Sequence, residues 1–297
     1  MAAGDIERVV TLPDGRALAI REGGDLAGAA VVYHHGTPAS RYQAGFIEAA
    51  ARCHGIRVVS FNRPGYGSAP ETPPSLASVG TDAVHIADAL DLEQFSTVGV
   101  SGGGPYALAT ALAGPGRVSQ VAVVAGIGPW RLIEPEDPSD PERELLALAD
   151  AGKIDAALAG YRAVLTAEIG DLLAIGDDSA LVEAYLDGAP PDDLQWLDQE
   201  KRLLWAVDLR EAVRTGDGYA RDNVAWGGRW DIDIAAIRCP VRLYYGNLDR
   251  LVSPSHGRWL ADRIPGAIQV TWPDAGHGIA SFGHWDTIFA SMRDESV

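Results

Sequence analysis

Short apolar runs alternate with longer segments of helical periodicity along most of this 297-residue chain. Residues 9–12 and 17–21 flank a Pro-Asp-Gly turn, which predicts an antiparallel hairpin. After the hairpin, nearly continuous apolar runs predict buried strands, and apolar positions at helical spacing predict the helices between them. The predicted strands cover residues 30–34, 56–61, 95–100, 118–125, 241–245 and 267–272, and the predicted helices cover 40–53, 75–90, 103–113, 254–264 and 279–293.

This alternation breaks between residues 129 and 226, where helical patterns follow one another without a clear strand. Prolines interrupt the segment, and most of the tryptophans lie in it or at its edge. Alternating strands and helices predict a parallel sheet covered on both faces. The predicted fold is therefore α/β: a mostly parallel, doubly wound sheet of about eight strands. Residues 1–128 and 227–297 are expected to form the core, and residues 129–226 an inserted helical cap.

The composition is that of an ordinary globular protein, with 47% hydrophobic and 22% charged residues. A formal net charge of -17 argues against nucleic acid and anionic membranes as partners, because their phosphates attract lysine and arginine. We attribute the acidity to solubility. No apolar run is long enough to span a bilayer, and the first residues lack a signal-peptide pattern. We therefore expect a cytoplasmic protein, monomeric or homodimeric, that acts on a small molecule; its preference for arginine over lysine is typical of GC-rich bacteria.

The strongest chemical signal is the pentapeptide Gly99-Val100-Ser101-Gly102-Gly103, which matches G-x-S-x-G between a predicted strand and a predicted helix. In that context the turn holds the serine in a strained conformation clear of the sheet, and side chains replacing the outer glycines would collide. A plain glycine-rich turn is one alternative. A dinucleotide-binding loop is another, but its pattern needs glycine where Ser101 stands, and it usually follows the first parallel strand.

A serine hydroxyl needs a neighbouring base, and the base needs an acid that orients it. His277 follows the last predicted strand between two glycines, which suit a tight loop that presents one side chain. Asp249 follows the strand at 241–245. Each of them alone would be interpreted as a turn residue. Together with Ser101 they follow three separate strands, in the chain order Ser, Asp, His that α/β-hydrolases have.

The backbone N–H groups of Thr37 and Gly102 are the expected oxyanion donors, because both residues follow strands at the same edge of the sheet. Five further residues are candidates to line the substrate pocket. Each of them also has a structural interpretation. The histidine and the tyrosine could pack inside the protein, the arginine could lie on a solvated helix face, and the tryptophans could form the core of a small helical unit. No cofactor or metal is expected, because the histidines and cysteines match no metal-binding spacing. The five pocket candidates are His34, Arg41, Tyr66, Trp130 and Trp205.

These motifs together resemble the α/β-hydrolase superfamily, specifically its cap-bearing members similar to bacterial esterases and cofactor-free haloperoxidase-type hydrolases. The resemblance implies Ser101 as nucleophile, His277 as base and Asp249 as acid, with Thr37 and Gly102 as oxyanion donors. A serine nucleophile departs from haloalkane dehalogenases and epoxide hydrolases, and the H-G-T-P loop departs from the glycine-rich loops of proline iminopeptidases and lipases. The matching segments are HHGTP (34–38), NRPGYG (62–67), GVSGGG (99–104), GNLDRLV (246–252) and AGHG (275–278).

The expected function is hydrolysis of a carboxylic ester of a small, partly apolar substrate through an acyl-enzyme. Tryptophans in the cap favour a substrate with apolar bulk, because a cap has to cover the reacting groups and exclude water. The same triad would also serve C–C bond hydrolysis, peroxidation, acyl transfer or a proline iminopeptidase-type activity. A non-catalytic ligand receptor on the same fold is a further alternative, because fold alone does not define function.

Overall fold

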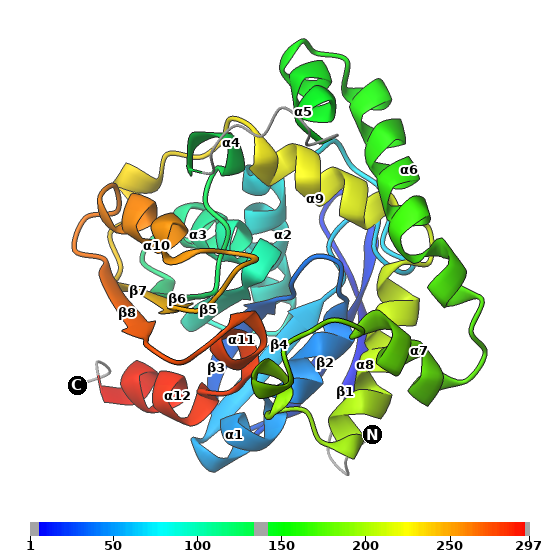
Figure 1. Ribbon diagram of the computed structural model, residues 1–297. Coiled ribbons are helices and arrows are strands. Elements are labelled where there is room, and N and C mark those ends of the chain that lie inside the picture. Colours follow the sequence, from blue (N-terminus) through cyan, green and yellow to red (C-terminus); the bar gives the residue numbers. More distant parts are fainter. Residues whose placement is uncertain (1–5, 134–141, 295–297) are drawn as a thin grey trace.

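The computed structural model of the protein describes residues 6–133 and 142–294, and its centre is one β-sheet of eight strands (Figure 1). The strands are β1 (Ile6–Thr11), β2 (Ala17–Gly24), β3 (Ala29–His34), β4 (Ile56–Phe61), β5 (Phe95–Val100), β6 (Val118–Val124), β7 (Val241–Gly246) and β8 (Ile268–Trp272). Their order is β1-β2-β4-β3-β5-β6-β7-β8. β2 pairs antiparallel with β1 and β4, and every neighbouring pair from β4 across to β8 is parallel, which confirms the predicted fold class.

Helices cover both faces of this sheet, as parallel strands with apolar side chains on both sides require. The helices of the core are α1 (Glu48–Cys53), α2 (Leu76–Ala89), α3 (Gly104–Ala113), α10 (Pro254–Ala261), α11 (His277–Phe282) and α12 (Trp285–Asp294). Residues of α2, α3 and α10, such as Ile86, Leu108 and Leu260, form one hydrophobic core with the sheet. Residues of α1 and α12, such as Ala51 and Phe289, form a second core on the other face.

Between β6 and β7 the chain forms only helices within the part that the structure describes, as the sequence predicts. They are α4 (Trp130–Ile133), α5 (Glu142–Asp150), α6 (Ile154–Leu173), α7 (Asp178–Tyr185), the 3₁₀ helix η3 (Pro191–Leu194), α8 (Gln199–Ala212), α9 (Asp217–Gly227) and the 3₁₀ helix η4 (Ile234–Ala236). We call residues 129–226 the inserted segment. Leu158 and Leu165 of α6 pack with Leu209 and Tyr219 in a third hydrophobic cluster. Figure 1 shows α5 and α6 away from the sheet, with α9 between them and the core helices.

Two predicted helices are each divided in the structure. Residues 40–53 form the 3₁₀ helix η1 (Arg41–Phe46) and then α1, where α8 approaches so closely that a Cβ on Gly45 would lie 2.5 Å from Leu204 Cδ2. Residues 279–293 belong to α11 and α12, which are separated by a turn at Gly283, and a Cβ there would lie 2.8 Å from the Ile279 carbonyl oxygen. The first break lies beside a close contact with α8, and the second lies at a tight turn. Helical periodicity in the sequence indicates neither of these features.

A carboxylate of α8 connects the inserted segment to the chain that follows β3. Asp208 is buried and accepts hydrogen bonds from Ser40 N (2.8 Å) and Ser40 Oγ (2.6 Å). Burial raises the pKa of Asp208 to about 7, although the bonds from Ser40 oppose this change. The carboxyl group therefore keeps its proton in the folded protein over a pH range in which an unfolded chain has lost it.

This shift predicts how stability depends on pH. Between about pH 4 and pH 7 only the folded state holds the Asp208 proton, so the free energy of unfolding falls as the pH rises through this range. Replacement of Asp208 by asparagine keeps an oxygen acceptor for Ser40 and removes the titration. We expect urea denaturation to show that the free energy of unfolding falls between pH 4.5 and pH 7.5, and that this fall is about 1–3 kcal/mol smaller in Asp208→Asn than in the unmodified protein. Parallel stability curves for the two proteins would contradict the prediction.

Candidate active site

Ser101 lies at a sharp turn between β5 and α3, where the 3₁₀ helix η2 (Ser101–Gly103) begins. Its φ angle is 52°, a left-handed conformation that is uncommon for a residue with a side chain. A Cβ on Gly99 would overlap the carbonyl of Gly103, and a Cβ on Gly103 would overlap the carbonyl of His34. The outer glycines of the pentapeptide are therefore required by close backbone approach, and the serine side chain is left partly exposed.

Asp249 and His277 are joined by a hydrogen bond of 2.7 Å between Oδ2 and Nδ1. The Asp249 carboxylate is buried after β7, and its other oxygen accepts from the backbone N–H groups of Leu251 (2.9 Å) and Val252 (2.8 Å). His277 follows β8, and 20% of its side chain is exposed. Because an ionised carboxylate only accepts hydrogen bonds, Nδ1 carries the proton and Nε2 is free to act as a base.

The turn of Ser101, the Asp249 loop and the His277 loop follow β5, β7 and β8, which run parallel and end at one edge of the sheet. Within residues 6–133 and 142–294, no hydrogen bond joins Ser101 to His277. Such bonds are often long before substrate binds and shorten in the reacting complex. The structure therefore joins two residues of the predicted triad, Asp249 and His277, by a hydrogen bond.

Thr37 and Gly102 are neighbours in the structure, as two oxyanion donors have to be. A Cβ on Gly102 would overlap the Thr37 hydroxyl and lie 3.4 Å from the Thr37 backbone nitrogen. A Cβ on Gly36 would lie 3.6 Å from Ser101 Cβ. The loop after β3 thus packs directly against the turn of Ser101, and glycine at position 102 makes that approach possible.

A buried polar network that the motifs do not reveal holds this loop. Asp222 of α9 forms an ion pair with Arg63 (2.5 Å) and accepts from the Thr37 hydroxyl (2.6 Å). Arg63 also donates to the carbonyl oxygens of His35 (2.5 Å) and Gly36 (3.0 Å). The two charges lie almost without exposure, at 1% and 3% of their side-chain surfaces. The NRPGYG segment (62–67) by itself does not reveal this role of Arg63, and no local pattern distinguishes Asp222 from other acids of the inserted segment.

The network also explains the position of Tyr66. Its hydroxyl donates to Asp222 (2.8 Å), as does that of Tyr106 (2.6 Å), and neither side chain is appreciably exposed. Burial raises the pKa of both phenols well above their usual value. Tyr66 is therefore packed beneath the loop, with its polar group already in use.

His34 and Arg41 are both buried. His34 Nε2 hydrogen bonds to Thr110 Oγ1 (2.9 Å), and burial lowers the pKa of the imidazole well below its usual value. Arg41 forms ion pairs with Glu211 (2.5 Å) and Glu7 (3.1 Å). The expected solvated helix face is wrong for Arg41, because acidic residues distant in the sequence cover it. Its charge is already paired within the protein, which weakens the prediction that it binds a substrate carboxylate.

The two tryptophan candidates lie in different places. Trp205 of α8 packs against Phe46 and Trp196, with ring centroids 5.9 and 5.6 Å away. Trp130 of α4 lies 5.4 Å from the ring of His256, which is fully buried. The two tryptophans therefore belong to different aromatic groups of the structure.

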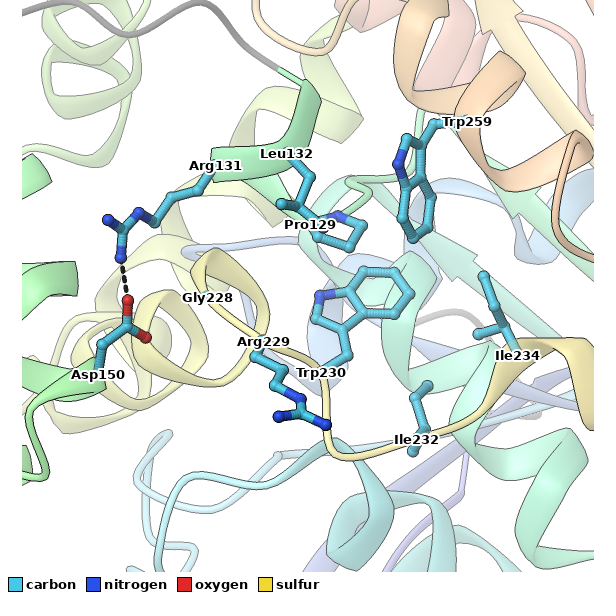
Figure 2. Close-up of a pocket in the computed structure, with 10 residues that line it drawn as sticks. All are labelled: Pro129, Arg131, Leu132, Asp150, Gly228, Arg229, Trp230, Ile232, Ile234 and Trp259. Carbon is cyan, nitrogen blue, oxygen red and sulfur yellow. Dashed lines mark hydrogen bonds and ion pairs between the residues drawn. The ribbon is translucent and has the colours of Figure 1, made fainter.

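An open cavity of about 510 Å³ lies between α4, α10 and the chain that follows α9 (Figure 2). Trp230, Trp259 and Ile232 supply apolar walls, and an ion pair between Arg131 and Asp150 borders one side. None of the predicted triad or oxyanion residues lines this cavity. It is thus separate from the candidate active site.

Two further findings concern metals and membranes. No group of three or more histidine, cysteine or acidic side chains with the arrangement of a metal site occurs among the described residues. No helix in the described ranges is both long enough and apolar enough to cross a membrane.

The fold has a counterpart among known families. The family described as alpha/beta hydrolase fold matches residues 29–283, so the chain belongs to the α/β-hydrolase family and is a hydrolase. A putative carbamate hydrolase, RutD, from Caulobacter sp. (strain K31) is 28% identical over 83% of this chain and 89% of its own length. A non-heme chloroperoxidase from Streptomyces lividans is 32% identical over 52% of this chain and 55% of its own.

Solved structures agree on the fold. An esterase from Exiguobacterium antarcticum superposes with a TM-score of 0.67 at 17% identity, over 98% of this chain and 99% of that one. At this identity the likeness concerns architecture alone.

The buried pair of Arg63 and Asp222 predicts a large and non-additive effect on stability. Asp222→Leu leaves the guanidinium buried without its counter-charge, so the free energy of unfolding should fall by about 3–5 kcal/mol. Arg63→Met should cost a similar amount, because it leaves the carboxylate unpaired. We expect the double variant Arg63→Met, Asp222→Leu to be more stable than the sum of the single effects by at least about 1 kcal/mol, measured by urea denaturation of all four proteins. Strict additivity would show that the two charges are not coupled.

Proposed function

We propose that the protein hydrolyses carboxylic esters of small, partly apolar substrates, with Ser101 as the nucleophile of an acyl-enzyme. The observation that carries this proposal is the 2.7 Å hydrogen bond between Asp249 and His277, at the sheet edge where Ser101 is held in a strained turn. This combination leaves one imidazole nitrogen available as a base, and the serine hydroxyl is partly exposed. The membership in the α/β-hydrolase family supports it.

In the first step, Ser101 Oγ attacks the carbonyl carbon of the ester while His277 Nε2 takes the hydroxyl proton. The carbonyl oxygen becomes negatively charged, and the backbone N–H groups of Thr37 and Gly102 stabilise it. The tetrahedral species then expels the alcohol, which leaves with the proton from His277. Asp249 holds the imidazole in the required tautomer and stabilises its positive form.

In the second step, water attacks the acyl-enzyme while the same imidazole accepts a water proton. The carboxylic acid leaves, and the proton returns to Ser101 Oγ. No cofactor enters this cycle, because both steps need only proton transfer and charge stabilisation.

Apolar side chains beside the proposed triad favour a substrate with apolar bulk. Leu248 and Leu251 flank Asp249 and are 58% and 65% exposed. Phe282 of the helix that begins with His277 packs against Trp196, with ring centroids 4.5 Å apart. Exposed apolar surface next to a polar reacting group suits an ester whose acyl or alcohol part is hydrophobic. One relative is named as a putative carbamate hydrolase, so a carbamate ester belongs in the substrate panel.

The nucleophile is tested by replacing Ser101 with alanine. Hydrolysis of short p-nitrophenyl esters should fall about 10⁴-fold or more in kcat, because removal of one triad member disables the unit. A fluorophosphonate should label the unmodified protein at Ser101, as located by peptide mass spectrometry. Ser119→Ala changes an exposed serine of β6 and serves as the matched control with unchanged activity. Undiminished ester hydrolysis by Ser101→Ala would contradict the proposal that Ser101 is the nucleophile.

The acid is tested by Asp249→Asn. The asparagine amide can donate to Nδ1, which favours the imidazole tautomer whose Nε2 carries the proton and cannot act as a base. We expect kcat for the same esters to fall by about 10⁴-fold at neutral pH, with little change in KM. A variant that keeps more than a tenth of the activity would show that another residue orients His277.

A further inference from the structure

Asp193 of the inserted segment is bonded to the backbone directly after His277. Its Oδ2 accepts from Gly278 N and its Oδ1 from Ile279 N, each at 2.9 Å. Asp193 lies in η3, and the two amides belong to the first turn of α11, which begins at His277. One carboxylate therefore holds two consecutive backbone groups next to the proposed base, from an element about 85 residues away in the chain.

The glycines on either side of His277 have a role that the sequence does not reveal. Gly276 has a φ of −82°, which other residues also adopt, so a tight turn does not require glycine there. A Cβ on Gly276 would lie 2.6 Å from the Asp193 carboxyl carbon. A Cβ on Gly278 would lie 2.5 Å from the Asp193 carbonyl oxygen and 2.9 Å from Trp196 Nε1. Both glycines make room for the inserted segment.

The same segment also contacts the other end of α11. Trp196 packs against Phe282, the last residue of α11, with ring centroids 4.5 Å apart, and against Phe46 at 5.4 Å. Asp193 and Trp196 thus hold the first and last turns of α11 by two independent kinds of contact. Any displacement of residues 193–196 would release both ends of the helix that carries His277.

We propose that Asp193 is a positioning residue for His277, and that it couples the placement of the inserted segment to the geometry of the base. This inference rests on the proposed function. Asp193 acts through the backbone of Gly278 and Ile279: with both bonds formed, His277 is held against Asp249 with Nε2 directed to the serine. With the bonds broken, the imidazole loses its backbone support, and displacements of about 1 Å at a reacting group cost up to about 10²-fold in rate.

The test uses Asp193→Ala, Asp193→Asn and Gly278→Ala in the full chain. The alanine variant removes both acceptors, the asparagine variant keeps one, and Gly278→Ala displaces the segment without removing its charge. We expect Asp193→Ala and Gly278→Ala to lower kcat for p-nitrophenyl butyrate, and the rate of fluorophosphonate labelling at Ser101, by about 10–100-fold. KM should change less than about threefold, and Asp193→Asn should lie between these variants and the unmodified protein.

Asp192 provides a matched control, because it is the neighbouring acid of η3 and its carboxylate accepts, among the residues that the structure describes, only from Gln195 (3.3 Å). Asp192→Asn should keep the kcat and labelling rate of the unmodified protein. Hydrogen exchange of the peptide that contains residues 278 and 279 should accelerate in Asp193→Ala and stay unchanged in Asp192→Asn, which reports the contact without using activity.

The outcomes separate the two proposals. Labelling of the unmodified protein at Ser101 supports the proposed function, and if kcat and labelling are then unchanged in Asp193→Ala and Gly278→Ala, the positioning role alone is overturned. A loss of thermal stability with unchanged kcat would likewise overturn it, because it would show a purely structural contact. Failure of the unmodified protein to react at Ser101 overturns the proposed function, and the positioning role with it.

Discussion

The ion pair between Arg63 and Asp222 is the contact on which the arrangement around the predicted nucleophile depends. Both charges are buried, and burial of either without the other would be costly. Arg63 uses its remaining donors on the carbonyls of residues 35 and 36, and Asp222 uses its remaining acceptor capacity on Thr37 and two tyrosines. These bonds fix the loop after β3, the turn after β4 and helix α9 to one another. Because Arg63 and Asp222 are buried, water cannot replace the protein groups that they bind.

This rigidity helps to maintain the strained backbone conformation of Ser101. A left-handed conformation at a residue with a side chain costs about 1–3 kcal/mol and persists only where the surroundings enforce it. The enforcing contacts are close approaches of the loop after β3: Gly103 lies against the backbone carbonyl of His34, and Gly102 lies against the side chain of Thr37. Since the ion pair holds the loop that contains Thr37, it also supports the strained turn from the opposite side.

The parts that could be predicted from the sequence are those whose signal is local. The strands at 56–61 and 95–100 have the predicted limits, because continuous apolar runs between turns leave little choice. The turn of Ser101 was predictable because the glycines that its close backbone approach requires form a short pattern directly after a strand. Arg41 shows the limit: its partner Glu211 lies 170 residues away, and nothing near Arg41 in the sequence indicates that it is buried. The break between η1 and α1 was missed for a similar reason, since periodicity does not register how closely α8 approaches at Gly45. The turn at Gly283 was missed because the apolar pattern continues through it.

The acidity of the chain, attributed to solubility on composition alone, has a more specific use in the inserted segment. Asp193, Asp208 and Asp222 lie on three different helices, and each accepts hydrogen bonds from a loop at the carboxyl edge of the sheet. Their donors are mainly backbone N–H and hydroxyl groups, which cannot be recognised as partners in a sequence. A carboxylate is suited to this task because each of its oxygens can hold a separate donor. Cationic side chains in the same positions could not accept from these donors, so at these three positions the acidic residues fasten the inserted segment to the α/β-hydrolase core.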